Sequence, residues 1–276
     1  MRRPGTSCLR RFCGRRRNGG TPQTDVADRP APDRIAMRAT ALIDLVEGRL
    51  ETEVDVVGPE TAWPIVGPAL LAHATSSLES IVFRLRPYGA HNDSSRLLRS
   101  LYDHVVTFAW LAADTPARLP LWRKEDLKER LKIHREFADA GVQMLPDADR
   151  KQMESAVAGI EGNAPNLAIK AAMADQYWIP RIGGALRPDS LSSFRGFYTI
   201  LFREQSGLVH ATMRGLNHVT IDLEPPRKRV VREAPLGEGS PYGMATVVYG
   251  VGLLVAAQAL DWPIAEEVNT IFERYP

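Results

Sequence analysis

The feature that most constrains the fold of this chain is a charge-free stretch near its C-terminal end. No charged residue occurs from Tyr242 to Leu260, which is long enough for a helix that crosses a membrane. Three glycines and one glutamine keep the hydropathy of this stretch moderate, and no basic cluster follows it. A helix that is apolar on every side is more often the centre of a globular bundle. We therefore expect a soluble, cytoplasmic protein with no membrane partner.

The rest of the chain carries the apolar periodicity of helices. Apolar residues recur at spacings of three and four, and convincing strand alternation is missing apart from short pieces near 219–223 and 229–231. This pattern predicts an all-α fold, a multi-helix antiparallel bundle with short connections. The expected helices lie at about 33–50, 61–86, 94–113, 121–140, 147–160, 167–175, 192–216, 242–260 and 263–274. The helix at 94–113 is expected to be central, because its second half is nearly all apolar.

The expected domain organisation begins with an arginine-rich tail that carries no acidic residue up to position 24. Its arginine, glycine and proline content predicts disorder. We expect a non-essential extension, with Met37 as the true start; the alternative is an arginine-rich arm for RNA or an anionic membrane. The expected parts are a tail at 1–32, a helical core at 33–223, a linker at 224–241 and C-terminal helices packed on the bundle at 242–276.

Composition argues against several functional classes. Outside residues 1–24, 28 basic residues face 33 acidic ones, which is a poor match to bulk nucleic acid. The two cysteines, Cys8 and Cys13, both lie in the tail, so the body has no disulfide framework or thiolate metal site. The six histidines lack zinc-type spacing, and no phosphate-binding glycine motif is complete. We expect no cofactor and no metal.

One group of polar residues lies on the helix expected at 94–113. Arg96, Arg99 and Asp103 fall on one face, and Arg99 and Asp103 are four residues apart, so they can form an ion pair. The pair precedes the most apolar part of the helix. A half-buried ion pair is more often structural than catalytic, so we expect a structural role.

A second group lies between Tyr198 and His210. On a continuous α-helix Arg203 and His210 share a face, with Ser206 between them, and Gly207 lets a ligand or another backbone approach. Metal-independent cleavage of RNA needs such groups: Arg203 would hold the phosphate and His210 would act as acid or base. The alternative, favoured for a single histidine, is that His210 bonds a neighbouring helix in the core.

The two groups together carry a family resemblance. Arg99 with Asp103, followed about a hundred residues later by Tyr198, Ser206 and His210, resembles a bacterial all-helical family of unknown function. In that family an Arg-x-x-x-acid helix precedes a Tyr…Ser-x-x-His helix, and the resemblance covers about residues 70–218. The acid of the first motif is usually glutamate and is Asp103 here. The resemblance implies that the five side chains meet in space, and it supplies no activity.

A weaker resemblance is to HEPN domains, the helical bundles of many toxin and antiviral RNases. Their motif is an arginine, four to six residues, and a histidine. Arg203 and His210 fit this spacing, and so do Arg99 and His104, although the latter two would point about 140° apart on an ideal helix. HEPN RNases usually act as dimers.

These observations favour a non-catalytic module for protein interaction or scaffolding. The alternative is a HEPN-like, metal-independent RNase in defence or growth arrest, with Arg203 and His210 in the site. The partner is expected to be another protein or a second copy of the chain, and RNA only under the alternative. A pocket is expected between the helices at 94–113 and 192–216, near Gly207.

Overall fold

The computed structural model describes residues 33–50, 62–88, 90–182, 193–204, 220–222, 228–230 and 241–276. Its described part belongs to one compact unit that begins at Asp33. The expected tail at 1–32 lies outside the described residues. Met37, the expected start, lies inside the first helix, whose N-terminus is capped by the Asp33 carboxylate accepting from the amide of Ala36 at 3.1 Å.

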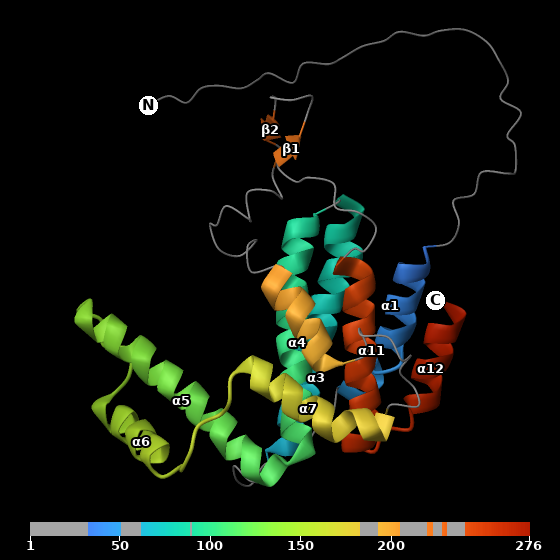
Figure 1. Ribbon diagram of the computed structural model, residues 1–276. Coiled ribbons are helices and arrows are strands. Elements are labelled where there is room, and N and C mark those ends of the chain that lie inside the picture. The colour runs from blue at the N-terminus through green and yellow to red at the C-terminus, as the bar shows by residue number, and fades with distance from the viewer. Residues whose placement is uncertain are drawn as a thin grey trace, which may run out of the picture. The chain divides into compact units, whose positions relative to one another are not determined.

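The described residues form an all-α bundle with one short hairpin (Figure 1). The helices are α1 Arg34–Asp44, α2 Glu47–Leu50, α3 Trp63–Glu79, α4 His91–Ala113, α5 Thr115–Asp139, α6 Asp147–Ala158, α7 Leu167–Ile182, α8 Phe194–Tyr198, α11 Pro241–Ala259 and α12 Ala265–Arg274. Two π-helices continue α3 and α8, η2 Ser80–Leu85 and η4 Thr199–Glu204, and the 3₁₀ turn η3 Arg86–Tyr88 follows η2.

The hairpin lies where the sequence shows two short pieces of strand alternation, near 219–223 and 229–231. Strand β1, Thr220–Asp222, pairs antiparallel with β2, Lys228–Val230, so that Ile221 lies opposite Arg229. β2 lies within residues 224–241, the range expected to be a linker. The backbone groups of β2 find hydrogen-bond partners across the hairpin.

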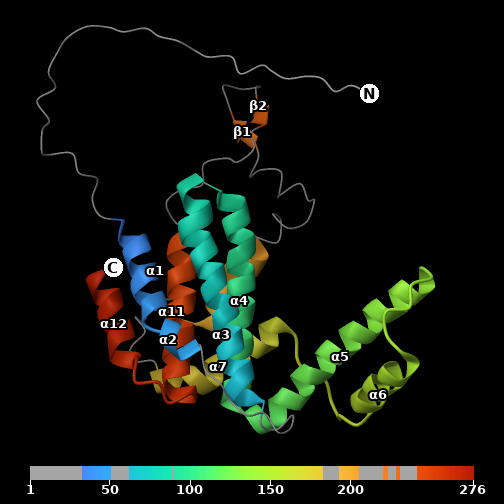
Figure 2. The same ribbon diagram turned by 180° about the vertical axis from the view of Figure 1, so that it is seen from behind.

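The core is built around α11, which lies against α4 and α3 in both ribbon views (Figure 2). Most of α11 is buried, including Tyr249 and Leu253, and it is surrounded by the buried faces of its neighbours. Trp110, Tyr102 and Phe108 on α4 are among the largest fully buried side chains. The prediction that 242–260 is the centre of a bundle, and that 94–113 is central, agrees with this burial. α11 therefore lies inside the bundle, as expected for a helix that is apolar on every side.

Two helical stretches are long and apolar enough to cross a membrane by length and composition alone. They are Trp63–Tyr88 and Pro241–Ala259, and 50% and 67% of their most apolar windows are buried inside the protein. The core helix of a bundle meets the same criteria, so these stretches are weak evidence for a membrane span.

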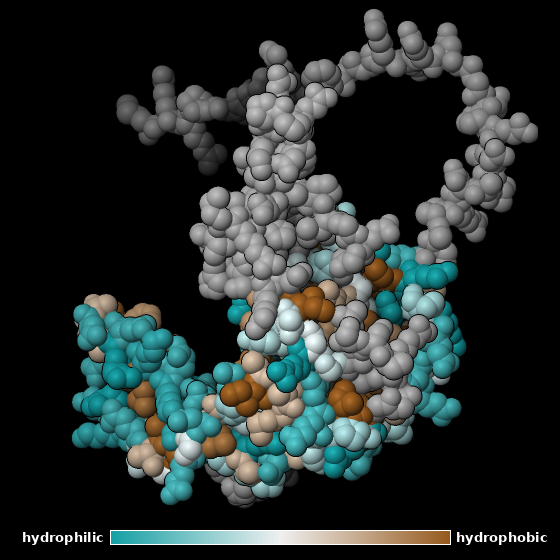
Figure 3. Space-filling model, viewed as in Figure 1, coloured by the Kyte–Doolittle hydropathy of each residue, from teal (hydrophilic) through white to brown (hydrophobic). Residues whose placement is uncertain are grey.

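α5 leaves the bundle together with α6 and forms an arm (Figures 1 and 2). It begins at Thr115, six residues before the expected position, because the Asp114 carboxylate caps it by accepting from the amide of Ala117. The arm is mostly hydrophilic on its surface (Figure 3), with ion pairs such as Arg130–Asp126 at 2.8 Å. Phe137 near the end of α5 is exposed, with an exposed fraction of 43%.

Candidate functional site

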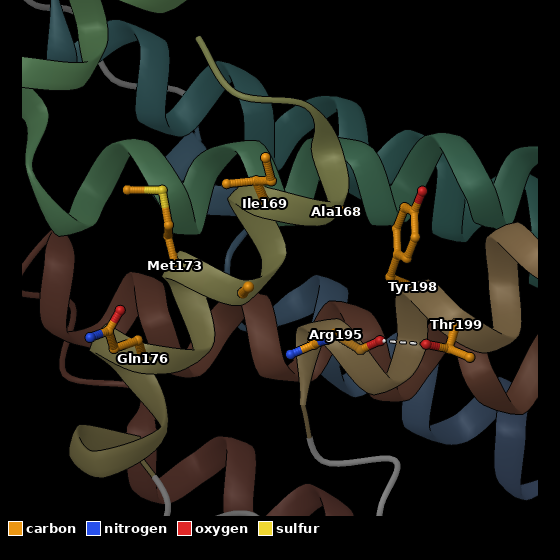
Figure 4. A pocket seen from close by; sticks show the side chains of 8 residues that line it. Ala168, Ile169, Met173, Gln176, Arg195, Tyr198 and Thr199 are labelled. Atoms are coloured by element: carbon orange, nitrogen blue, oxygen red, sulfur yellow. Dashed lines mark hydrogen bonds between the residues drawn. The ribbon is translucent and has the colours of Figure 1, made fainter.

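A pocket of about 420 Å³ lies between α7 and α8 (Figure 4). The two helices contribute walls of different chemistry. The α7 wall is apolar, apart from Gln176 at its end, and the α8 wall is polar. The lining residues are Ala168, Ile169, Ala172, Met173 and Gln176 from α7 with Arg195, Tyr198 and Thr199 from the segment that begins with α8.

Hydrogen bonds from α7 and α4 position α8. The Asp175 carboxylate on α7 accepts from the backbone amides of Phe194 at 2.7 Å and Arg195 at 2.9 Å, and the Tyr102 hydroxyl on α4 donates to the Phe194 carbonyl at 2.6 Å. Burial raises the pKa of Asp175 above its usual range, and burial raises that of Tyr102 with Asp175 adding to the effect. Because these bonds involve backbone atoms of α8, they fix the pocket wall rather than one side chain.

Tyr198 connects the pocket to a stack of rings and a cation. It lines the pocket and lies parallel to the Phe202 ring, with ring centroids 4.8 Å apart and an interplanar angle of 14°. The guanidinium carbon of Arg99 lies 4.0 Å from the centroid of the same Phe202 ring. Two residues that the sequence singled out, Arg99 on α4 and Tyr198 on α8, are therefore brought together, with Phe202 in contact with both.

Asp103 does not take the predicted role. Among the described residues no ion pair joins it to Arg99, and its carboxylate accepts from the Thr107 hydroxyl at 3.3 Å. Asp103 interacts electrostatically with Lys170 on α7. Burial lowers the pKa of Lys170, while Asp103 opposes that shift, and the Lys170 ammonium lies 5.1 Å from the centroid of the Trp110 ring.

The prediction that Arg203 and His210 share one face requires a continuous α-helix. The first part of this segment is not α-helical. Residues Thr199–Glu204 form a π-helix, which has more residues in each turn than an α-helix. Only the backbone of Arg203 is described, and Ser206, Gly207 and His210 lie outside the described residues. The described pocket shares Tyr198 with the predicted group, but it lies between α7 and α8 rather than beside α4.

Sequence reasoning missed the residues that build this site. Asp175 resembled the last residue of a short helix, because Pro180 and two glycines follow it. The apolar wall had a detectable signal: Ala168, Ile169, Ala172 and Met173 repeat at helical spacing and include two small residues. Phe202 had no such signal in the sequence, since an aromatic residue in an apolar helix is normally part of the core.

The described residues hold no group of three or more histidine, cysteine, aspartate or glutamate side chains that could bind a metal ion. His73 and His104 stack across α3 and α4 with ring centroids 5.2 Å apart. The Nδ1 atom of His104 lies 2.7 Å from the Ser100 carbonyl, so it carries a proton and donates. This histidine is therefore fixed to its own helix.

Comparison with family models gives no match, and neither the curated proteins nor the solved structures provide one at a significant level. The function must therefore be inferred from the geometry. The pocket offers an apolar floor, hydrogen-bonding groups and one cation, Arg195. Such a site can bind an apolar group and orient it by a polar neighbour.

Proposed function

We propose that this chain is a non-catalytic interaction module that docks a partner protein in the pocket between α7 and α8. The observation that carries the proposal is the contrast between the two walls, an apolar α7 and a polar α8. A side chain of a partner can enter such a pocket and lose its contact with water, which is how interface anchors contribute most of their binding energy. The module is proposed to act in the cytoplasm.

The polar groups around the pocket support a binding role over a catalytic one. Asp175 is engaged by two backbone amides, the Tyr102 hydroxyl by a carbonyl, and the Arg99 guanidinium lies against Phe202. A general base must be free to reach the proton that it removes. Each of these groups instead holds one helix to another, so the described side chains stabilise a surface.

A peptide display selection against the full chain tests the proposal. The wild-type chain should enrich peptides with a recurring large apolar residue, and Ala172→Arg should abolish the enrichment because the new side chain fills the pocket. Ala148→Arg, the same substitution at an exposed position of α6, should leave it unchanged. Enrichment that survives Ala172→Arg in a chain with unchanged circular dichroism would contradict the proposal.

A second candidate function, a HEPN-like RNase that binds RNA, is favoured by one observation. The segment that carries Arg203 turns from α-helix into π-helix at Thr199, and π-helical turns occur frequently at functional sites. The candidate depends on the side chains of Arg203 and His210 acting together, which is a prediction from the sequence.

A further inference from the structure

Arg195 is the one residue with a formal charge among the eight described residues that line the pocket. Its side chain is exposed, and no ion pair within 4.0 Å engages its guanidinium in the described part of the chain. An exposed arginine that forms no ion pair with the described residues, at the rim of an apolar pocket, favours a ligand with an anionic group beside its apolar part.

Two hydrogen bonds hold the backbone of Arg195 in place. Its amide donates to Asp175, and its carbonyl accepts from the Thr199 hydroxyl at 3.2 Å, a bond drawn in Figure 4. Asp175 is the acid that interacts electrostatically with Arg195, but both of its oxygens accept from backbone amides of α8. Among the described residues no side chain or carbonyl takes up the five N–H donors of the guanidinium, so they can bind a ligand.

The size of the pocket limits what can bind there. A volume of about 420 Å³ lies at the small end of the range for ligand pockets, roughly 300–1,000 Å³. Ile169, with an exposed fraction of 49%, would lose its contact with water when an apolar group covers the α7 wall. The pocket therefore suits one large side chain with its neighbouring residues, and not a whole helix.

From this arrangement we infer that the docked segment is an acidic peptide: a large aliphatic or aromatic anchor on the α7 wall, with an aspartate or glutamate next to it bound by Arg195. The inference rests on the proposed function and adds the charge of the partner. A carboxylate fits the guanidinium with two parallel N–H···O bonds, whereas an amide in its place accepts through one oxygen and has no charge.

The display selection is repeated with three full-length variants. The wild type should enrich Asp or Glu within two positions of the anchor, Arg195→Glu should enrich Lys or Arg there, and Arg195→Gln should keep the anchor without a charge preference. Arg123→Glu reverses a charge at an exposed position of α5, outside the residues that line the pocket. This control should select the same peptides as the wild type.

The test is completed by measuring the affinity of each chain for the peptide that the wild-type chain enriches most. Replacing its acid by the amide should weaken binding to the wild type about tenfold and leave binding to Arg195→Gln unchanged, a difference of about 1.4 kcal/mol. If all chains enrich the same flanking residues around an anchor, the inference of an acidic peptide is wrong and the proposed docking function stands. If no chain enriches an anchor, the inference and the proposed docking function are both wrong.

Discussion

The ring of Phe272 on α12 lies directly against the backbone of Gly250 on α11. A Cβ atom at position 250 would overlap the edge of that ring, with the ring Cζ only 2.5 Å away. On α1, the guanidinium carbon of Arg38 lies 5.2 Å from the centroid of the same ring. Glycine at position 250 therefore sets how closely the last helix approaches the core.

Gly250→Ala should destabilise the protein. Overpacking costs about 1–3 kcal/mol, and the gain in helix propensity of about 0.5–1 kcal/mol offsets only part of that. Gly243→Ala on the same helix should instead stabilise by about 0.5 kcal/mol, because nothing lies within 4 Å of its Cβ position. Urea unfolding with both variants measures the difference, and equal stabilities would contradict the packing described here.

A buried hydrogen bond joins α3 and α11, and removing its donor should cost less stability than removing its acceptor. The Thr75 hydroxyl donates to the Leu71 carbonyl at 2.9 Å, so the Tyr249 hydroxyl, 2.6 Å away, donates to Thr75. Thr75→Val leaves the tyrosine hydroxyl buried without a partner and should cost about 1–3 kcal/mol. Tyr249→Phe leaves Thr75 bonded to Leu71 and should cost about 1 kcal/mol or less. Chemical denaturation measures both losses of stability. A larger loss for Tyr249→Phe than for Thr75→Val would show that Tyr249 is not the donor.

Double-mutant cycles compare two interaction energies of Arg99: with the Phe202 ring that it contacts, and with Asp103, the acid predicted as its partner. The cycle of Arg99→Met with Phe202→Leu should give a coupling of about 1 kcal/mol, as expected for a cation near an aromatic ring. The cycle of Arg99→Met with Asp103→Asn should give less than about 0.3 kcal/mol. A larger coupling to Asp103 would restore the ion pair that the sequence predicted.

Asp175 makes stability depend on pH in a defined direction. Burial holds the pKa of its folded form above the unfolded value of about 3.9, so the folded state binds the proton more tightly. This contribution is fully present below the unfolded pKa and is lost as the pH rises through the folded pKa. The stability of the wild type relative to Asp175→Asn should therefore fall as the pH is raised from about 3.

Unfolding curves across this range, with Asp149→Asn on the exposed surface of α6 as the control, measure the effect. A wild type that gains stability relative to Asp175→Asn with rising pH would show that the amide hydrogen bonds of Phe194 and Arg195 dominate over burial.

Growth on overexpression separates the two candidate functions. Under the interaction function, wild type, Arg203→Ala and His210→Ala chains should slow growth equally or not at all. Under the RNase alternative, the wild type should arrest growth and both variants should relieve the arrest at equal protein levels. The second result would favour the HEPN-like function over the one proposed here.

The bundle and its centre could be predicted from the sequence because both follow from patterns of apolar residues. Val105, Val106 and Trp110 stand in the run that marked α4 as central, and all three are buried. The expected end of the helix at 121–140 also agrees with the structure, since Gly141 follows α5 with a φ of +81°, a conformation that favours glycine.

The pocket could not be predicted, because tertiary contacts override local signals there. The helix expected at 167–175 continues through Pro180 to Ile182. Trp178 in this last part donates from Nε1 to the Ala109 carbonyl at 2.7 Å. Proline is tolerated near a helix end when such contacts hold the turn. The change from α8 to the π-helix η4 has no signature in the sequence.

The position of α11 has a consequence for biosynthesis. Four helices that precede it in the chain, α1, α3, α4 and α7, pack against the buried surface of α11. A ribosome makes those helices first, so their apolar faces stay uncovered until this late segment emerges. The bundle can close only after nearly the whole unit has been synthesised, and a nascent chain stopped before residue 241 would depend on chaperones.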